Sequence, residues 1–432
     1  MVALCWVDNA GITRVKTIPL GRLERVAGWG VGMSPVFDVF LVNDDITASE
    51  HIGGPGGDLR LIPDLDRLTV LAGQPGWAWA PVDRFTQGGQ VYAACQRSFA
   101  RRMAAEAARR GLALRVSFEV EWAVGSDDGG HFRPACRGPA YGMTRVIELS
   151  DYGREVVGAL ERQGVVVEQF HPEYAEGQLE ISVAPADPVA AADDSVLVRQ
   201  TIRAVSAAFG FQASFAPSVI AGAVGNGGHV HLSVWRDGQN LLAGGPRRYG
   251  LSADGEAFAA GILAGLPALA AVGSPSVASY LRLVPSHWAG VFQCWGRENR
   301  EAALRLVTGS AGEHDIRANL EVKCFDLAAN PYLVTGSLIA AGLAGLDSGA
   351  DLPEEVTGDP ADLPGTELDR RGIRRLPRSL AEATGCRENS TVLRQAMGDP
   401  LFAAFIAVRR AESELFADVS PDDIAAQTRW RW

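Results

Sequence analysis

Three observations predict an α+β protein with two domains. Residues 1 to about 90 contain short β-type segments, many Pro and Gly residues and no long helical pattern. The pattern changes at Gln96, where apolar spacing and strong helix formers predict a helix that closes at Gly111. Several of the later strands follow one another without a helix between them, which favours a largely antiparallel sheet. We therefore expect domains at residues 1–92 and 93–432.

Sequence patterns also place the individual elements of the second domain. The expected order is strand 114–124, helix 149–163, strands 165–171 and 178–184, helix 188–209, strand 229–235, helix 254–271, strands 300–307 and 319–326, and helix 331–346. Residues 349–375 are rich in Pro, Asp and Gly and predict a surface loop. Two helices are expected to end the chain.

Composition excludes several classes of partner. A net charge of -11 would repel the phosphates of a nucleic acid. The apolar stretches are short and interrupted by Gly and Pro, so we expect no membrane span. The six cysteines include no CxxC pair, and the N-terminus has no signal-peptide pattern. These features predict reduced thiols and a cytoplasmic location.

Four expected strands share an unusual polar face. "SFEVEW" places Glu119 and Glu121 on one face, and "QLEIS" does the same with Glu180. "GHVHLS" aligns His229 and His231, and "NLEVK" aligns Glu321 with Lys323, while Glu173 lies in a turn. Each strand alone is explained by a solvated face or an ordinary histidine hydrogen bond. All four on one concave sheet would gather carboxylates that need cations, and oxygen-rich ligation with one imidazole suits Mg²⁺ or Mn²⁺.

Arginines suited to phosphate follow in "GRENREAALR", which contains Arg297, Arg300 and Arg305. An amphipathic segment with exposed arginines would give the same pattern. No Walker A sequence is present, and the glycine-rich "AGAVGNGGH" is a weak signal by itself. Carboxylate-held metal beside arginines nevertheless points to a phosphate substrate.

In combination, these segments resemble the glutamine synthetase family. The matching stretches are "FEVEW", "HPEYAEGQLEIS", "GNGGHVHLS", "YLRLVPSHWAG", "GRENREAALR" and "LEVKCFDLAANPYL". They stand in the family's order, and "WVDNAGITRVKTIPL" is similar to its opening domain. The resemblance implies an N-terminal β-grasp domain and a large catalytic domain with a curved, mainly antiparallel sheet.

The resemblance also implies roles for individual residues. One metal ion would be held by Glu121, Glu173 and Glu180, and a second by Glu119, His229 and Glu321. The other implied residues fall into three groups: Arg282, Arg300 and Lys323 for catalysis; Ser233, Arg300, Arg305 and Arg317 for ATP; and Gly225, Arg282, His287 and Trp288 for the substrates. ATP would phosphorylate the γ-carboxylate of glutamate, and an amine would then displace the phosphate.

Departures from the family pattern concern the amine. Trp288 stands where glutamine synthetases carry the acidic residue that helps deprotonate ammonium. Val42 aligns with their ammonium-binding Asp, although Asp44 or Asp45 could replace it if the loop shifts. An aromatic wall suits an alkylammonium with an apolar body better than ammonium. The pattern therefore resembles the γ-glutamyl-amine ligases that act on polyamines or ethanolamine.

Other departures concern the nucleotide and the acid. Lys323 and Asn319 replace two usual arginines, and Arg317 could assume the role of the second. Val224 replaces an asparagine that often contacts glutamate, so another acid substrate stays open. The base that deprotonates the amine is not identified, with Glu298 and Glu176 near the relevant motifs.

Two alternatives remain at this point. One is a conventional glutamine synthetase that uses ammonium, and the other is a non-catalytic relative with a structural or regulatory role. Retention of all the metal-ligand positions argues against the second. The resemblance further implies a homo-oligomer, commonly a double ring of twelve subunits.

Overall fold

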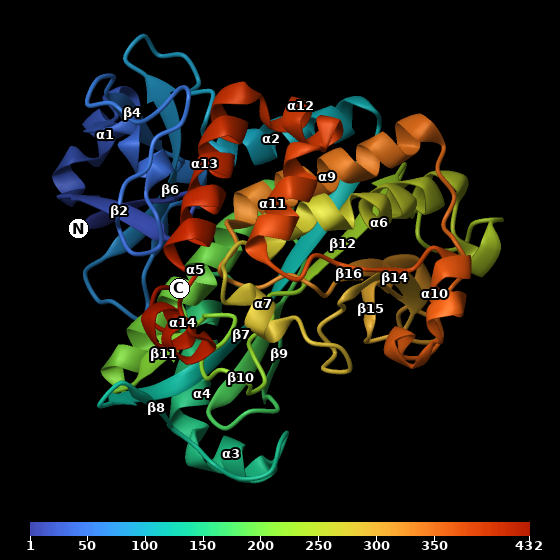
Figure 1. Ribbon diagram of the computed structural model, residues 1–432. Helices are drawn as coiled ribbons and strands as arrows, with labels where there is room; N and C mark the ends of the chain where they lie inside the picture. Colours follow the sequence, from blue (N-terminus) through green and yellow to red (C-terminus); the bar gives the residue numbers. More distant parts are fainter.

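The N-terminal part of the chain forms a small mixed sheet in the computed structural model, which describes residues 1–432 (Figure 1). Strand β1 runs parallel to β6, and the other pairs are antiparallel. In sheet order the strands are β2 Thr13–Ile18, β1 Val2–Val7, β6 Ala78–Thr86, β4 Leu59–Pro63 and β3 Val31–Met33, with β5 Thr69–Val70 also on β6. Helix α1, Leu23–Trp29, packs against β4 over a small apolar core of its own.

A second sheet of eleven strands carries the rest of the chain. Its order is β17 Arg374–Arg375, β14 Phe292–Arg297, β15 Ala302–Val307, β16 Asn319–Val322, β12 Val230–Arg236, β7 Ala113–Asp128, β10 Gln178–Val183 and β9 Val167–Pro172; β8 His131–Pro134 and β11 Gln212–Ser214 also pair with β7, and β13 Gln239–Asn240 with β12. Only β14 and β15 are parallel. The expected α+β class with a mainly antiparallel sheet is confirmed.

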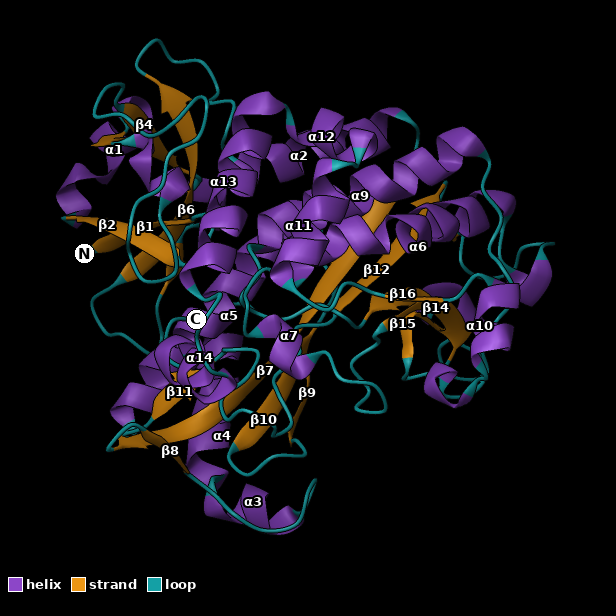
Figure 2. Cartoon of the chain, in the orientation of Figure 1, coloured by secondary structure: helices purple, strands orange, loops and turns teal.

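Helices cover one side of the long strands β7 and β12, where α2, α6, α9 and α11 gather (Figure 2). The helices are α2 Gln96–Arg109, α3 Met143–Glu148, α4 Ser150–Arg162, α5 Pro188–Ala208, α6 Ala253–Gly273, α7 Ser279–Arg282, α8 His314–Arg317, α9 Pro331–Ser348, α10 Gly365–Arg371, α11 Leu380–Glu388, α12 Thr391–Met397, α13 Asp399–Leu415 and α14 Pro421–Thr428. The five long helices expected from the sequence are present. Their apolar faces enclose a core of 98 buried residues that leaves the polar strand faces free.

Helix α6 passes closest to α9 at a pair of glycines. A Cβ atom at Gly261 would lie 2.3 Å from the Ala341 carbonyl oxygen and 2.7 Å from the Gly345 Cα atom, so only glycine permits this approach. By length and composition α6 could cross a membrane, but 78% of its most apolar window is buried inside the protein. That burial is typical of a core helix.

The structure corrects two expectations about the C-terminal part. Residues 349–375 are not a plain loop, because they contain α10 and the short strand β17. Glu367 pairs with Arg370 and Arg371 one turn later, and the left-handed Gly372 closes the helix. Four helices rather than two end the chain, because side chains of Ser379, Ser390 and Ser420 cap new helix starts.

Strand lengths differ more modestly from expectation. Strand β7 extends to Asp128 because it pairs there with β8 as a hairpin. Strand β16 ends at Val322 rather than near 326, and the following residues turn toward α6, where the Ser274 hydroxyl donates to the Cys324 carbonyl. The domain division at residues 92 and 93, between β6 and α2, stays a prediction.

Candidate active site

Strand register places the polar side chains of five neighbouring strands on one face. Glu321 of β16 lies opposite His231 of β12 and opposite Arg305 of β15. On the other side of β7, Glu121 lies directly opposite Glu180 of β10. Because side chains of a strand alternate between faces, these residues share the face opposite the apolar core.

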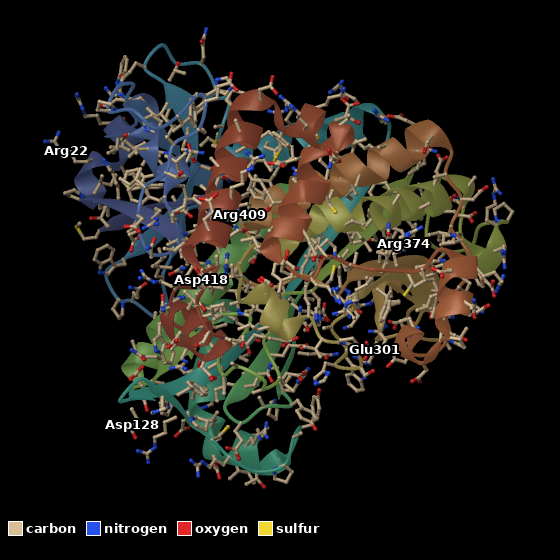
Figure 3. All side chains as sticks on the ribbon, in the orientation of Figure 1. Arg22, Asp128, Glu301, Arg374, Arg409 and Asp418 are labelled. Carbon is tan, nitrogen blue, oxygen red and sulfur yellow. The ribbon has the colours of Figure 1, made fainter.

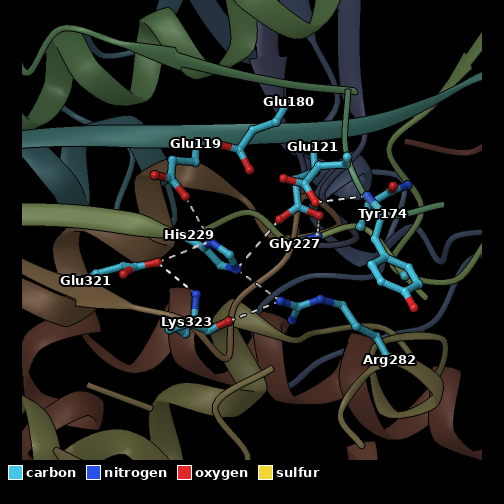
Figure 4. A network of polar contacts seen from close by, with 12 residues as sticks. Glu119, Glu121, Tyr174, Glu180, Gly227, His229, Arg282, Glu321 and Lys323 are labelled. Atoms are coloured by element: carbon cyan, nitrogen blue, oxygen red, sulfur yellow. Dashed lines mark hydrogen bonds and ion pairs between the residues drawn. The ribbon is translucent and has the colours of Figure 1, made fainter. Parts of the chain in front are cut away.

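This face is the floor of a cavity that has a volume of about 910 Å³. Its lining includes all six metal ligands implied by the sequence, Glu119, Glu121, Glu173, Glu180, His229 and Glu321. Arg282, Arg300, Arg305, Lys323, Gly225, His287 and Trp288 line it as well. Figure 4 shows His229 at the centre of this network, between Glu119, Glu121 and Glu321. The fold thus gathers residues that are as much as 204 positions apart in sequence (Glu119 to Lys323).

A first cluster of carboxylates surrounds His229. Its Nδ1 atom lies 2.9 Å from Glu119 Oε2 and 3.3 Å from Glu321 Oε1. The second histidine of the strand, His231, places Nε2 2.9 Å from Glu119 Oε1. Burial would raise the pKa of Glu119, but the charge of His231 and hydrogen bonds from both imidazoles lower it well below its usual range. Ligand atoms of Glu119, His231 and Glu321 lie within 4.8 Å of one another, as a shared metal ion requires.

A second cluster of carboxylates lies beside β9. His171 Nε2 is 3.3 Å from Glu180 Oε1, and His171 Nδ1 is 3.6 Å from Glu173 Oε1. Burial, with the charges of Glu119, Glu121 and Glu173, raises the pKa of Glu180 to about 8. A cluster of buried acids with too little positive charge fits a divalent cation, which would allow all of them to ionise. The donor set of carboxylate oxygens with imidazole nitrogen is one that Mg²⁺ and Mn²⁺ accept.

A glycine allows the chain to approach this cluster. A Cβ atom at Gly227 would lie 2.6 Å from His229 Nε2 and 2.7 Å from Glu121 Oε1, so any other residue would obstruct the site. The Gly227 N–H donates to Glu121 Oε2 at 2.7 Å, and Gln178 Nε2 donates to the same oxygen at 3.1 Å. These two bonds fix the orientation of the Glu121 carboxylate.

Cations border the cluster on the side of β15 and β16. Arg305 donates to Glu321 at 2.9 Å and to Glu298 at 2.8 Å, and Lys323 Nζ donates to Glu321 at 3.0 Å. Burial would raise the pKa of Glu321, but the charge of Lys323 and of the neighbouring histidines lowers it to about 2. Arg282 places Nη2 3.2 Å from His229 Nε2 and leaves its buried Nη1 atom without a partner. These groups can receive the oxygens of a carboxylate or phosphate substrate.

Some residues implied by the sequence lie elsewhere. Ser233 is outside the lining and accepts a hydrogen bond from the Trp235 indole N–H at 2.8 Å. Arg317 is also outside the lining, in α8, 3.8 Å from Glu168. The Asn319 Oδ1 atom accepts a hydrogen bond from His231 Nδ1 at 2.8 Å, a contact that an arginine would change.

Unlike Trp288, the other residues considered for the amine step do not line the cavity. Val42 is buried, and its N–H donates to Glu412 at 2.8 Å, while Asp44 pairs with Arg14 and Arg431. Neither Glu298 nor Glu176 lines the cavity. Glu298 accepts hydrogen bonds from the Thr308 N–H and from Arg305. Glu176 lies 3.8 Å from Arg137.

The structure adds residues that motif reading missed. Tyr141, His171 and Tyr174 line the cavity, and the Tyr141 hydroxyl donates to Glu173 at 2.7 Å. His171 and Tyr174 lie inside the motif "HPEY", so their proximity to Glu173 was readable from the sequence. Glu301, labelled in Figure 3, was not: it supports the loop of Trp288 through a contact that no local pattern encodes.

The fold and this site define an enzyme that handles ATP with divalent metal ions. Residues 93–426 match the family described as "Glutamine synthetase, catalytic domain". The chain is 58% identical over 434 aligned residues to gamma-glutamylpolyamine synthetase GlnA3 of Streptomyces coelicolor, covering 100% of this chain and 93% of that protein. It is 31% identical to the glutamine synthetase of Halobacterium salinarum, over 96% of this chain and 91% of that one.

Solved structures agree with the sequence comparison. A glutamine synthase homologue superimposes with a TM-score of 0.89 at 32% identity, covering 100% of this chain and 98% of that chain. GmaS in complex with ADP gives a TM-score of 0.84 at 26% identity, covering 97% and 94%. The protein therefore belongs to the glutamine synthetase family. The expected activity, an ATP-dependent ligase that joins an amine larger than ammonia to the γ-carboxylate of glutamate, is confirmed.

Proposed function

We propose that the amine substrate is a polyamine and that two Mg²⁺ ions, or Mn²⁺ ions in their place, serve the reaction. The named relative from Streptomyces coelicolor supports the choice of amine. The observation that carries the proposal is the rim of the cavity, where three aromatic side chains stand above the acidic floor. They are Trp288, Tyr141 and Tyr174, with exposed fractions of 56%, 50% and 60%.

This rim suits a long cation with an apolar body. Methylene groups gain contact area on aromatic rings, and each ammonium group is attracted to a ring face by about 0.5–2 kcal/mol. The Arg300 guanidinium lies 5.6 Å from the Trp288 ring, so one face of the indole already meets a cation. A substrate ammonium would use the rest of the indole and the two tyrosines. Ammonium itself has no methylene groups to bury and gains less from such walls.

In the first step, an oxygen of the glutamate γ-carboxylate attacks the terminal phosphorus of ATP and displaces ADP. Arg282 receives the α-carboxylate of glutamate beside Gly225, which orients the γ-carboxylate. Arg300, Arg305 and Lys323 face the transferring group and neutralise charge that develops on its oxygens. The product is γ-glutamyl phosphate. The carboxylates of the floor would hold divalent ions, which would supply further positive charge to stabilise the transferring group.

In the second step, the neutral nitrogen of the amine attacks the γ-carbonyl carbon and phosphate leaves, which gives the amide. The ammonium form must first lose a proton because it has no lone pair. Ligand sets for the two ions are Glu121, Glu173 and Glu180 on one side and Glu119, His229 and Glu321 on the other. His171 and His231 lie within reach of these sets and hold the carboxylates in place.

The remaining proposals concern assembly and location. We expect a homo-oligomer, with the dodecamer that the family resemblance implies as the proposed form. A cytoplasmic location is supported by six cysteines that form no disulfide, five of them buried.

The direct test is phosphate release from ATP with Mg²⁺ and glutamate across ammonium, methylamine, ethanolamine, putrescine and spermine. Glu121→Ala is the inactive control, and Trp288→Phe serves beside the wild type as a variant that keeps an aromatic ring. Turnover with putrescine or spermine at concentrations where ammonium is inactive supports the proposal. Efficient turnover with ammonium would make the protein a conventional glutamine synthetase. No turnover with metal still bound would direct attention to Val224 and a different acid.

A further inference from the structure

A second cavity shares no lining residue with the catalytic cavity and is lined by cations. It has a volume of about 190 Å³ and is bounded by α5, the turn between β1 and β2, Phe215 and the last two residues. In Figure 1 the C-terminus lies beside α5, and the Phe215 N–H donates to the Trp432 carbonyl at 3.0 Å. Arg199, Arg203 and Arg431 line the cavity and no acidic side chain does, so the one carboxylate among the lining residues is the chain-terminal group of Trp432.

Arg199 is built into the wall of this cavity. It is only 4% exposed, and two of its nitrogens donate to backbone carbonyls, Nε to Ser195 at 3.2 Å and Nη1 to Leu327 at 2.8 Å. Its Nη2 atom is buried and has no partner. A buried donor of a charged group that lacks a partner is expensive, so such groups are normally satisfied.

Arg203 stands one helical turn after Arg199 and pairs with no acidic side chain. Its guanidinium lies over the Phe215 ring at 5.2 Å, and burial lowers its pKa to about 10. Burial also lowers the pKa of Arg199 to about 10, with the charge of Arg203 adding to the effect. Two like charges four residues apart on a helix repel each other, and here both are largely withdrawn from water.

Two acids near the β1–β2 turn and the chain end pair with other cations. Asp8 pairs with Arg14 at 2.6 Å, and Asp44 pairs with Arg14 at 2.7 Å and with Arg431 at 3.0 Å. Arg199 and Arg203 form no ion pair with an acidic side chain, whereas the buried Arg84 and Arg97 each have aspartate partners. Arg387 is likewise buried without an ion pair, but it does not line this cavity, whereas Arg199 and Arg203 line it together.

We propose that the cavity binds a small oxyanion, a phosphate or a short dicarboxylate, between Arg199 and Arg203. The planar guanidinium forks match the oxygens of either group. At about 30 Å³ for each water in the liquid, the volume corresponds to roughly six waters, which admits such an ion and excludes a nucleotide. The bound ion would tie α5 to the β1–β2 turn and, through the Arg199 contact with Leu327, to the segment that follows β16.

Thermal unfolding with inorganic phosphate and with succinate, in metal-free buffer, tests this inference. Arg300→Gln is the background, because it weakens phosphate binding in the catalytic cavity. Arg203→Gln is the test, and Arg154→Gln on the exposed surface of α4 is the control for the same change in net charge. We expect phosphate or succinate to raise the melting temperature of the background and of the control, since a ligand of the folded state stabilises it.

In the Arg203→Gln protein we expect that shift to disappear and the Kd, measured by calorimetry, to rise at least about tenfold. Without added anion this variant should unfold no earlier than the background, because repulsion with Arg199 is relieved. If phosphate raised the melting temperature equally with and without Arg203, the inference would be overturned. A second result would also overturn the inference: neither anion changes the melting temperature, but Arg203→Gln changes the mass of the oligomer. An acidic group of another copy would then fill the cavity. Phosphate and succinate arms together identify which oxyanion is preferred.

Discussion

The Glu301 carboxylate accepts a hydrogen bond from the backbone N–H of Trp288 at 2.8 Å and thereby supports the aromatic wall of the active site. Trp288 has a φ of 54°, and Ser286 two residues earlier has a φ of 58°. Both residues therefore have a left-handed backbone conformation that residues other than glycine rarely adopt. Ser286 in turn donates to Asp359 at 2.7 Å. Two carboxylates thus hold a strained loop that presents the indole to the cavity.

Replacing Glu301 should therefore alter amine binding more than nucleotide binding. Glu301→Ala removes the acceptor of the Trp288 N–H, and we expect the KM for the amine to rise by about tenfold with little change in the KM for ATP. Glu301→Gln keeps an acceptor oxygen and should recover most of the loss. Initial rates with each substrate varied in turn measure both constants. An equal increase in both KM values in Glu301→Ala would show that the contact serves the whole site.

The indole itself should contribute through its ring. Trp288→Ala is expected to raise the KM for putrescine by about 2- to 30-fold, the equivalent of a cation–π attraction of 0.5–2 kcal/mol. Trp288→Phe should fall between the alanine variant and the wild type. Competition between ammonium and putrescine in one assay measures the selectivity directly. Unchanged selectivity in Trp288→Ala would show that the indole does not select between putrescine and ammonium.

Loss of metal should abolish turnover and also change the stability of the protein. We expect a chelator to stop phosphate release and Mg²⁺ or Mn²⁺ to restore it. Without metal, Glu180→Gln should be at least as stable as the wild type, because it removes one charge from a crowded group of buried acids. Calorimetric titration of Mn²⁺ into wild type, Glu180→Gln and Glu321→Gln counts the sites. A full complement of tight sites in both variants would refute the assignment of these ligands.

Arg305 should act on ATP through its planar fork. It bridges Glu321 and Glu298, so Arg305→Lys keeps the charge but loses one of the two contacts. We expect the KM for ATP to rise by about tenfold and the KM for the amine to stay near the wild-type value. Arg297→Lys is a suitable control, because Arg297 pairs with Glu355 and does not line the cavity. Similar kinetics for both lysine variants would exclude Arg305 from the nucleotide site.

A buried acid at the contact between α13 and the N-terminal part should make stability depend on pH. Glu412 is 3% exposed, accepts from the Val42 N–H at 2.8 Å and lies 3.1 Å from Arg409. Burial raises its pKa from 4.5 to about 7 despite the charge of Arg409. A raised pKa means that the folded state holds the proton more tightly, so this contribution to stability is complete below pH 4.5 and is lost as the pH rises to 7.

At roughly 1.4 kcal/mol for each pKa unit, the loss amounts to about 3 kcal/mol. The Glu412→Gln variant has no proton to lose, so the difference in free energy of unfolding between it and the wild type should change over this interval and be constant above it. Denaturant unfolding at a series of pH values measures that difference. A difference that is constant from pH 4.5 to 7 would show that Glu412 is ionised throughout.

The sequence by itself determined the fold class and the chemistry of the catalytic floor. Alternation places Glu119 with Glu121, and His229 with His231, on one face of a strand, because the side-chain period of a strand is two. Those local rules predicted a carboxylate face, and the family resemblance implied which residues bind metal and phosphate, an assignment that stays a prediction. They could not place Glu301 beside Trp288, because that contact depends on how the chain folds back on itself. They also could not divide the end of the chain into four helices, because helix caps and packing against other segments set those boundaries.

Only the tertiary structure decided which strands are neighbours. The order β15, β16, β12, β7 and β10 brings Arg305, Glu321, His229 and Glu180 together, and sequence spacing contains no information on that order. The same is true of Arg199 and Arg203, which read as an ordinary helix surface until the β1–β2 turn and the chain end enclose them. A residue's type fixes what it can bind, but its charge balance and burial depend on segments that reach it from far along the chain.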